Sequence, residues 1–363
     1  MSPGRRIAGI AATLGVAVGA TAFEVSRQSR RIGRRVGDET PFGTLRSRPI
    51  TVVADDGVPL HVEVDEVEDK TQAPNAGRRA RGRVAPAPLT VVFAHGYALN
   101  LDCWHFQRAA YRGLVRTVFY DQRSHGRSGR SPSGHATIEQ LGHDLLAVLD
   151  AVASEGPVVL VGHSMGGMTI VALAEQHPEI FGERVVGVGL ISTTAGGLDP
   201  SRILLPMIPA KLTGRVTHEA VRTLARGHRT VDGIRRAGRA AAMVAIDKLA
   251  FGEDMPEAYV NFVDDMLSET PFEVVAEFFP SFGALDKFDA VRALSQVPTT
   301  IVGGTADKLT SIGHSRKLHA NIAGSTLLEC EGAGHMVILE RYNQVNAELD
   351  QLLSLATDQI ATR

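Results

Sequence analysis

One serine lies at the centre of a Gly-x-Ser-x-Gly sequence that joins a strand pattern to a helix pattern. The apolar run 158–161 leads into Gly-His-Ser-Met-Gly at 162–166, and helix-compatible residues continue over 168–176. Such a turn strains the backbone of its central residue and needs glycine on both sides, because a Cβ there would collide with neighbouring chain. The sequence therefore predicts a sharp strand–turn–helix unit. It presents the hydroxyl of Ser164 at the start of a helix, where negative charge is favoured.

The composition limits the class of protein more than its activity. The chain has 363 residues, of which 44% are hydrophobic, and a formal net charge of −2. This length and apolar content fit one large α/β domain with an insertion, or two smaller domains. The charge gives no reason to expect a nucleic-acid partner. Two cysteines are too few for a disulfide framework and no metal-ligand spacing is present, so we expect no metal and no other cofactor. Nothing in the sequence predicts an oligomeric state.

The first 48 residues differ from the rest of the chain. They contain nine arginines against three acidic residues, and the single charge within Ile7–Val25 is Glu24. Nineteen such residues can span a bilayer as a helix, so we expect a membrane anchor over residues 7–25. The alternatives are a signal peptide cleaved near Ala22, which would give a secreted protein, and a buried N-terminal helix. More arginines follow the segment than precede it, which favours a cytoplasmic position for the remaining chain.

From Pro49 onward, strand and helix patterns alternate. Apolar and β-branched runs predict strands at 50–53, 59–64, 89–94, 117–120, 158–161, 185–191, 299–302 and 325–330. A Thr-Ile-Glu-Gln capping box at Thr137 predicts the start of a helix, and residues 345–355 predict a closing amphipathic helix. Strands that alternate with helices favour a mostly parallel sheet with crossover helices.

Residues 196–285 interrupt this alternation. They contain several prolines and helix patterns, for example at 216–227 and 257–267. We interpret the segment as a helical cap inserted between two core strands. Most of its apolar residues, Phe278 and Phe282 among them, are expected to pack against the core, and a minority to line a substrate tunnel. The expected divisions are an N-terminal hydrophobic and basic segment at 1–48, the first part of the core at 49–195, the cap at 196–285 and the second part of the core at 286–363.

Two later strand ends carry residues that could activate the serine. A serine nucleophile needs a base, and the base needs an acid to orient it. In this architecture the expected order along the chain is serine, acid, histidine. Asp307 and His335 each follow one of the last two predicted strands, at the sheet edge where open α/β sheets build their sites. We therefore predict Ser164, Asp307 and His335 as a catalytic triad, with Asp199 as the alternative acid.

A tetrahedral oxyanion needs two N–H donors aimed at it. The backbone amide of Met165, directly after the nucleophile, is the first candidate. The second is the amide of Tyr97, in the His-Gly-Tyr-Ala loop at 95–98 that follows a buried strand. We expect the Tyr97 ring to form part of a pocket wall. His95 and His163 are expected to serve structural roles.

Together these motifs resemble those of serine hydrolases with the α/β-hydrolase fold, over roughly residues 50–356. The resemblance rests on the motifs at 95–96, 121–128, 162–167, 304–307 and 334–335. It implies a mostly parallel eight-stranded sheet with an inserted helical cap. The segment 121–128 resembles Asp-x-Arg-Gly-His-Gly-x-Ser, with Ser124 in place of a glycine. Asp121 and Arg123 are expected to form a structural pair in that turn.

The Gly-His-Ser-Met-Gly-Gly elbow resembles in particular those of monoacylglycerol lipases and small carboxylesterases. This resemblance implies cleavage of carboxylic esters by a Ser-His-Asp acyl-enzyme mechanism, and the apolar cap favours small-molecule, lipid-like acyl esters as substrates. Cofactor-free haloperoxidases or perhydrolases, thioesterases and C–C bond hydrolases share this triad and remain alternatives. A non-catalytic scaffold that retains the fold is a more remote one. Epoxide hydrolases and haloalkane dehalogenases carry aspartate at the elbow, so Ser164 argues against them.

Overall fold

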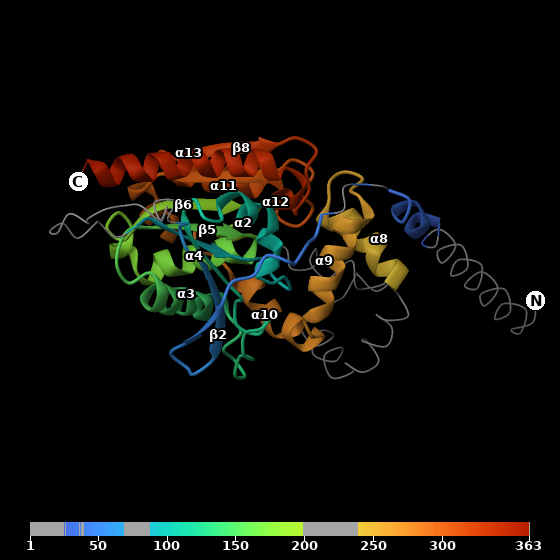
Figure 1. The fold of residues 1–363 in the computed structure, drawn as a ribbon, viewed down its shortest axis with the longest axis horizontal. Helices are drawn as coiled ribbons and strands as arrows, with labels where there is room; N and C mark the ends of the chain where they lie inside the picture. Colours follow the sequence, from blue (N-terminus) through green and yellow to red (C-terminus); the bar gives the residue numbers. More distant parts are fainter. Residues whose placement is uncertain are drawn as a thin grey trace, which may run out of the picture.

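The apolar runs of the sequence form one eight-stranded sheet in the computed structural model, which describes residues 25, 27–35, 37, 40–68, 88–198 and 239–362 (Figure 1). The strands are β1 (Pro49–Val53), β2 (Pro59–Asp65), β3 (Thr90–Ala94), β4 (Arg116–Tyr120), β5 (Val158–His163), β6 (Val185–Ile191), β7 (Thr299–Gly304) and β8 (Thr326–Cys330). Their spatial order is β1-β2-β4-β3-β5-β6-β7-β8. β2 is antiparallel to both of its neighbours and the other pairs are parallel. The predicted mostly parallel sheet is confirmed.

Helices cover both faces of this sheet. In the described part of the chain they are α2 (His105–Tyr111), α3 (Ile138–Val152), α4 (Met165–Gln176), α8 (Arg239–Ala250), α9 (Glu257–Glu269), α10 (Phe272–Ala284), α11 (Ile312–Asn321), α12 (Val337–Glu340) and α13 (Tyr342–Ala361), with 3₁₀ turns η1 (Leu101–Trp104), η2 (Pro178–Ile180) and η5 (Ala290–Gln296). One apolar cluster joins η1, α2, α12 and α13 to one face, and a second joins α3, α4, η5 and α11 to the other. In Figure 1, α13 lies above the sheet and α3 and α4 lie below it. β3 and β5 are buried on both faces, which explains their continuous apolar sequences.

Local sequence signals set where two of these helices begin. Thr137 is the N-cap of α3, and its hydroxyl accepts a hydrogen bond from the amide of Gln140 at 3.1 Å, as the capping-box pattern predicts. In a full capping box, the Gln140 side chain would also accept a hydrogen bond from the backbone amide of Thr137. Here the Gln140 side chain instead donates to Asp55 at 2.8 Å. Helix α4 begins at Met165, earlier than the helix-compatible run suggested, so that the helix starts directly after Ser164.

Helices α8, α9 and α10 belong to the predicted cap and lie beyond the carboxyl ends of the parallel strands (Figure 1). Gly196 and Asp286 form an antiparallel bridge, so the chain leaves the core and returns to it at one place. The helix predicted at 257–267 is present as α9. The helix predicted at 216–227 lies outside the described residues, and the domain boundaries stay a prediction.

The membrane expectation requires a correction. Across the described ranges, we find no helix that combines the length and the apolar character needed to cross a bilayer. This finding contradicts the predicted transmembrane helix and the membrane-associated location inferred from it. The anchor was inferred from length and lack of charge, but alanine and glycine, which make up nine of the nineteen residues at 7–25, contribute little apolar surface per residue. Except for Val25, that segment lies outside the described residues, as does the predicted cleavage position near Ala22.

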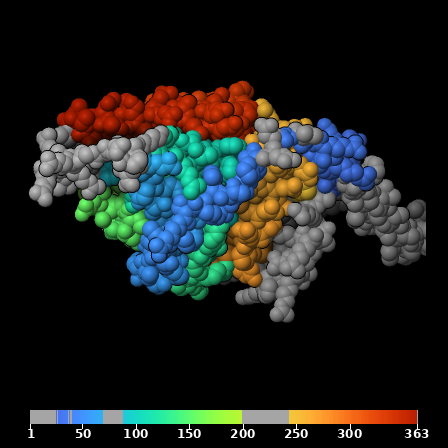
Figure 2. Space-filling view, in the orientation of Figure 1, coloured from blue at the N-terminus to red at the C-terminus, as the bar shows by residue number. Residues whose placement is uncertain are grey.

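The described residues ahead of β1 connect the cap to the core. Arg35 forms an ion pair with Asp247 of α8. Phe42 stacks on Phe262 of α9 with ring centroids 4.3 Å apart, and it meets His105 of α2 edge-on at 5.1 Å. In Figure 2, the blue N-terminal residues lie against the orange cap residues. This stretch therefore contacts both the cap and a core helix.

Two separate networks hold the turn after β4. Asp121 is fully buried and accepts hydrogen bonds from the amide of Leu101 at 2.8 Å and from a second amide within the turn. Arg123 is also fully buried, and it pairs with Asp144 of α3 at 2.6 Å and with Asp56 of the β1–β2 turn at 2.7 Å. The predicted pair between Asp121 and Arg123 is therefore wrong. Their side chains leave the end of β4 in different directions, one toward η1 and the other toward α3.

Ser124 occupies a left-handed conformation in the same turn, with φ of 65°. This explains why the resembling motif has glycine at that position, since a side chain is disfavoured there. The serine hydroxyl accepts a hydrogen bond from the amide of Ser131 at 2.8 Å, which offsets part of the conformational cost.

We expect Arg123→Met to lower the free energy of unfolding by about 3–5 kcal/mol, because Asp144 would remain buried without its cation. Urea denaturation of the variant measures this effect. The matched control is Arg130→Met, which removes an exposed ion pair with Glu277 and should cost less than about 1 kcal/mol. If the Arg123 variant lost no more stability than this control, the buried network would not be a structural determinant of the turn.

Candidate active site

The serine elbow lies between β5 and α4. Ser164 has φ of 53° and ψ of −117°, a strained conformation for a residue with a side chain. Close packing requires the glycines around it: a Cβ on Gly166 would lie 2.0 Å from the carbonyl oxygen of Ala94, and one on Gly162 would lie 2.5 Å from the backbone of Gly166. The strand–turn–helix unit predicted from the sequence is thus present, and its geometry explains the Gly-x-Ser-x-Gly spacing.

His335 lies directly against this serine. Its Nε2 is 2.9 Å from Oγ of Ser164, across 171 positions of sequence. The histidine belongs to the loop between β8 and α12, and the contacts that hold that loop include the following three. The Met336 amide donates to the carbonyl of Ala250 in the cap, the Gly334 amide donates to Glu340, and the ring of His163 donates to the carbonyl of His335.

Asp307, which follows β7, faces the other ring nitrogen of His335. Its Oδ2 is 2.9 Å from Nδ1 of His335, and its Oδ1 accepts the amides of Leu309 and Thr310 at 2.8 and 2.9 Å. Burial alone would raise the pKa of Asp307, but His335 and these hydrogen bonds outweigh it and lower the pKa below its ordinary value. The carboxylate is therefore ionised and orients Nδ1–H of the imidazole, leaving Nε2 free to accept a proton from the serine.

Thr310 was not predicted from the sequence. Its hydroxyl is 2.9 Å from Oδ2 of Asp307 and 2.8 Å from the carbonyl oxygen of Ser192 at the end of β6. Thr310 therefore links the acid to the neighbouring strand end. The pattern that could have revealed it is an aspartate followed three residues later by threonine, because aspartate commonly accepts the amides of the residues that follow it in a turn. Asp199, the alternative acid, lies outside the described residues.

The two predicted oxyanion donors lie on segments that approach the serine. Met165 is the first residue of α4, so its amide has no partner within the helix. Gly96 brings the loop after β3 close to the nucleophile, since a Cβ on it would lie 3.2 Å from Cβ of Ser164. Neither the Met165 amide nor the Tyr97 amide donates to an acceptor among the described residues. Both donors are thus available to a bound group.

Two histidines near the serine have structural roles, as expected from the sequence. Burial, with the neighbouring His125, lowers the pKa of His95 to about 3. Its Nε2 accepts the amide of Gln122 at 2.9 Å, so Nδ1 carries the hydrogen and donates to the carbonyl of Gly96 at 2.7 Å. Burial and the nearby His335 lower the pKa of His163 to about 3. Both rings are neutral at physiological pH.

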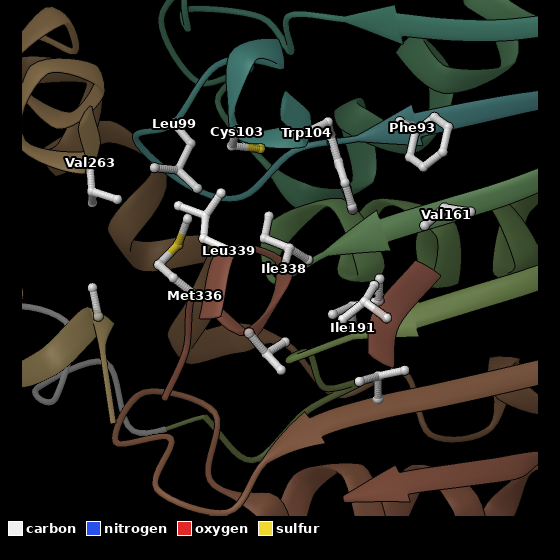
Figure 3. Packing of buried hydrophobic residues seen from close by; sticks show 14 of the residues in the cluster. Phe93, Leu99, Cys103, Trp104, Val161, Ile191, Val263, Met336, Ile338 and Leu339 are labelled. Carbon is white, nitrogen blue, oxygen red and sulfur yellow. The ribbon is translucent and has the colours of Figure 1, made fainter. Parts of the chain in front are cut away.

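An apolar cavity of about 100 Å³ adjoins the serine. Its described lining is Gly96, Tyr97, Leu99, Ser164, Met168, Leu198, Ala250, Val263, Leu267, Phe282, Leu309, Thr310, His335 and Met336. Figure 3 shows Leu99, Val263 and Met336, which come from the loop after β3, the cap and the histidine loop and belong to one apolar cluster. The Tyr97 side chain lines the cavity wall, as expected. Phe282, one of the apolar cap residues named from the sequence, also lines this cavity.

The comparisons with known proteins agree with the fold. Residues 91–348 match the model of the alpha/beta hydrolase family. The chain belongs to this family. Membership confirms the superfamily resemblance inferred from the motifs, and the family fold is the one described above.

Within the described ranges of this α/β hydrolase, no group of three or more His, Cys, Asp or Glu side chains is arranged to hold a metal ion.

Relatives of this α/β hydrolase cover most of its length. An uncharacterized protein of Mycobacterium tuberculosis is 26% identical over 269 residues, which is 71% of this chain and 73% of that protein. The enol-lactonase from Burkholderia xenovorans LB400 has a TM-score of 0.62 at 24% identity, covering 84% of this chain and all of the other. A thermophilic esterase from Thermogutta terrifontis has a TM-score of 0.64 at 21% identity, covering 85% of this chain and 99% of the other. At these identities the two structures support the fold alone.

Proposed function

We propose that this α/β hydrolase cleaves carboxylic esters of small molecules, with apolar, lipid-like acyl groups preferred. The observation that carries the proposal is the continuous chain from Ser164 through His335 to Asp307, in which both hydrogen bonds measure 2.9 Å. A serine, a histidine and a carboxylate in this order form the arrangement that activates a hydroxyl group for acyl transfer.

In the proposed mechanism, Oγ of Ser164 attacks the ester carbonyl carbon while Nε2 of His335 takes the hydroxyl proton. The carbonyl oxygen becomes an oxyanion, which the amides of Met165 and Tyr97 stabilise. The intermediate collapses, the C–O bond to the alcohol breaks, and His335 returns the proton to the departing alcohol. Water then attacks the acyl-serine by the same route, and release of the carboxylic acid regenerates the free serine.

Asp307 remains ionised throughout this cycle. Its carboxylate holds His335 in the tautomer with hydrogen on Nδ1 and stabilises the imidazolium that forms when the serine proton is taken. The lowered pKa of Asp307 and the two backbone amides on its other oxygen support this role. The Thr310 hydroxyl, 2.9 Å from Oδ2 of Asp307, further restricts rotation of the carboxylate.

The cavity lining supports an uncharged, apolar acyl group. Among the described lining residues, His335 and Tyr97 are the titratable ones, and leucine, methionine, valine and phenylalanine side chains supply most of the remaining wall. Burial of a charged acyl chain there would have no compensating partner. The likeness to structures named as an enol-lactonase and an esterase is consistent with ester chemistry in this fold.

The test is hydrolysis of p-nitrophenyl esters from acetyl to palmitoyl. We expect kcat/KM to rise by up to about fourfold for each added CH₂ until the cavity is filled, since each buried CH₂ contributes about 0.8 kcal/mol. p-Nitrophenyl butyrate should exceed the similarly sized p-nitrophenyl hemisuccinate by about tenfold or more, because the second ester carries a carboxylate. Ser164→Ala is the background control.

Equal rates with butyrate and hemisuccinate would contradict the preference for an uncharged acyl group. Failure of every ester in the series would contradict the proposed ester hydrolysis itself. Thioesters, peroxide-dependent acyl transfer and C–C bond cleavage would then be the reactions to assay, because the same triad supports them.

A further inference from the structure

The loop that carries one proposed oxyanion amide is attached to the cap by side-chain contacts. The Tyr97 hydroxyl donates to the carbonyl of Val275 in α10. One position further, the carbonyl of Ala98 accepts the hydroxyl of Thr270 at 3.1 Å, in the link between α9 and α10. Asn100 donates to Glu269 at 3.0 Å. All three contacts reach one short segment of the cap, residues 269–275.

This loop also contains a strained residue. Ala98 has φ of 56°, a left-handed conformation that is disfavoured for a residue with a side chain. Within the loop, the Leu99 amide donates to the carbonyl of Gly96 at 3.2 Å. Such a conformation persists when surrounding contacts determine it, and Thr270 supplies one of those contacts directly at Ala98.

The Tyr97 ring joins the substrate cavity to the same cap helix. It packs edge-on against Phe282 of α10 at a centroid distance of 4.8 Å, and both side chains line the cavity. Burial raises the pKa of the Tyr97 phenol well above its ordinary value, so the hydroxyl keeps its proton and remains a donor throughout the working pH range. An acyl group in the cavity would therefore touch the element that fixes this loop.

We propose that the Tyr97 side chain is a positioning residue, which fixes the oxyanion amide of the same residue relative to cap helix α10. The cap thereby helps to assemble the oxyanion site as well as enclosing the cavity. This inference rests on the proposed function, since it assigns a role within the same acyl-transfer site. Its consequence is that the contacts made by cap residues 269–275 control kcat.

Tyr97→Phe keeps the ring and the backbone amide but removes the hydrogen bond to α10. Loss of an oxyanion donor lowers rates about 10²–10³-fold, and a displaced donor should cost less, so we expect kcat to fall about tenfold with KM nearly unchanged. The effect falls on kcat because the amide binds the oxyanion more strongly than the ground-state carbonyl. Thr270→Val should also lower kcat. In the double variant, the fold-reduction in kcat should be smaller than the product of the two single reductions, because both changes weaken the same attachment.

The matched control is Tyr111→Phe, which removes another tyrosine hydroxyl that donates to the carbonyl of Asn346 and to Asp350, far from the serine. The measurements are kcat and KM with p-nitrophenyl butyrate, the rate of Ser164 labelling by a fluorophosphonate, and the thermal midpoint. A purely structural role would lower the midpoint of Tyr97→Phe and Tyr111→Phe alike and leave their kcat values equal.

Different outcomes separate this inference from the proposed function. If the wild-type protein is active and Tyr97→Phe matches it in kcat and in labelling rate, the positioning role is wrong and ester hydrolysis stands. If the wild-type protein labels at Ser164 but hydrolyses no ester, ester hydrolysis fails, and slower labelling of Tyr97→Phe would still support the positioning role. If folded wild-type protein neither labels nor hydrolyses, both are overturned.

Discussion

Asp307→Asn should lower kcat by about 10⁴-fold while the fold is retained. In the native site, Oδ1 of Asp307 accepts two backbone amides and Oδ2 faces Nδ1 of His335. An asparagine would keep its carbonyl oxygen toward the two amides, so its NH₂ group would face the imidazole. Nδ1 would then have to accept a hydrogen bond, and the hydrogen would move to Nε2. In this tautomer His335 cannot take the proton of Ser164.

The measurement is steady-state hydrolysis of p-nitrophenyl butyrate, together with thermal unfolding to show that the variant is folded. Asp350→Asn makes the same chemical change at an exposed position on α13 and should alter kcat by no more than about twofold. A folded Asp307 variant with more than about a tenth of wild-type kcat would show that another residue orients His335, since loss of this acid should cost far more.

The largest expected effect belongs to Ser164→Ala, which should lower kcat by about 10⁶-fold, because Ser164 carries the hydroxyl that Nε2 of His335 contacts and that would form the acyl intermediate. Residual hydrolysis would come from direct attack of water on the bound ester, with the oxyanion still stabilised by the backbone amides. The substitution should change the free energy of unfolding little, since alanine is smaller than serine and fits at the same position. It still has to adopt φ near 53°, as Ser164 does.

Ser315→Ala is the control for this variant, because Ser315 is also a buried serine, lies on α11 and is not part of the cavity lining. It should retain near wild-type kcat. Substantial ester hydrolysis by folded Ser164→Ala protein, in a preparation free of contaminating esterase, would mean that a different group starts the reaction. The triad mechanism would then be incorrect even though its geometry is present.

Much of the site could be predicted from the sequence because its chemistry depends on local patterns. The elbow needs glycines at 162 and 166 for steric reasons that hold in any such turn, and the strand before it and the helix after it are periodic. Asp307 and His335 could be placed because parallel strands end at one edge of the sheet, so chain order was enough to bring them to Ser164. The continuous apolar run of β3 similarly predicted a buried strand.

Long-range side-chain partners could not be predicted in this way. Arg123 was expected to pair with the aspartate two positions earlier, but its partners lie on α3 and in the β1–β2 turn. The contact of Thr310 with the carbonyl of Ser192, 118 positions earlier, was missed because it depends on the distance between two strand ends. The tether from Tyr97 to Val275 joins residues 178 positions apart. Each of these contacts is set by how elements pack, which no local pattern encodes.

The membrane prediction failed for a related reason. It relied on the length and low charge of residues 7–25, a criterion that does not measure how strongly alanine and glycine favour a bilayer. In contrast, the arginine-rich residues after that segment form specific contacts with the folded protein, such as the ion pair of Arg35 with Asp247. A high density of arginine was interpreted as flanking a membrane, whereas part of it serves to attach the chain to the cap.

The most direct test of the proposed function is the reaction of the native protein with a fluorophosphonate, followed by intact mass measurement and peptide mapping. The reagent forms a bond from phosphorus to an activated serine oxygen and releases fluoride, so it reports the nucleophile without any assumption about the substrate. We predict one adduct per chain, located at Ser164, absent in Ser164→Ala and formed much more slowly in Asp307→Asn. No adduct in folded protein, or an adduct at a different serine, would contradict the assignment of Ser164 as the nucleophile.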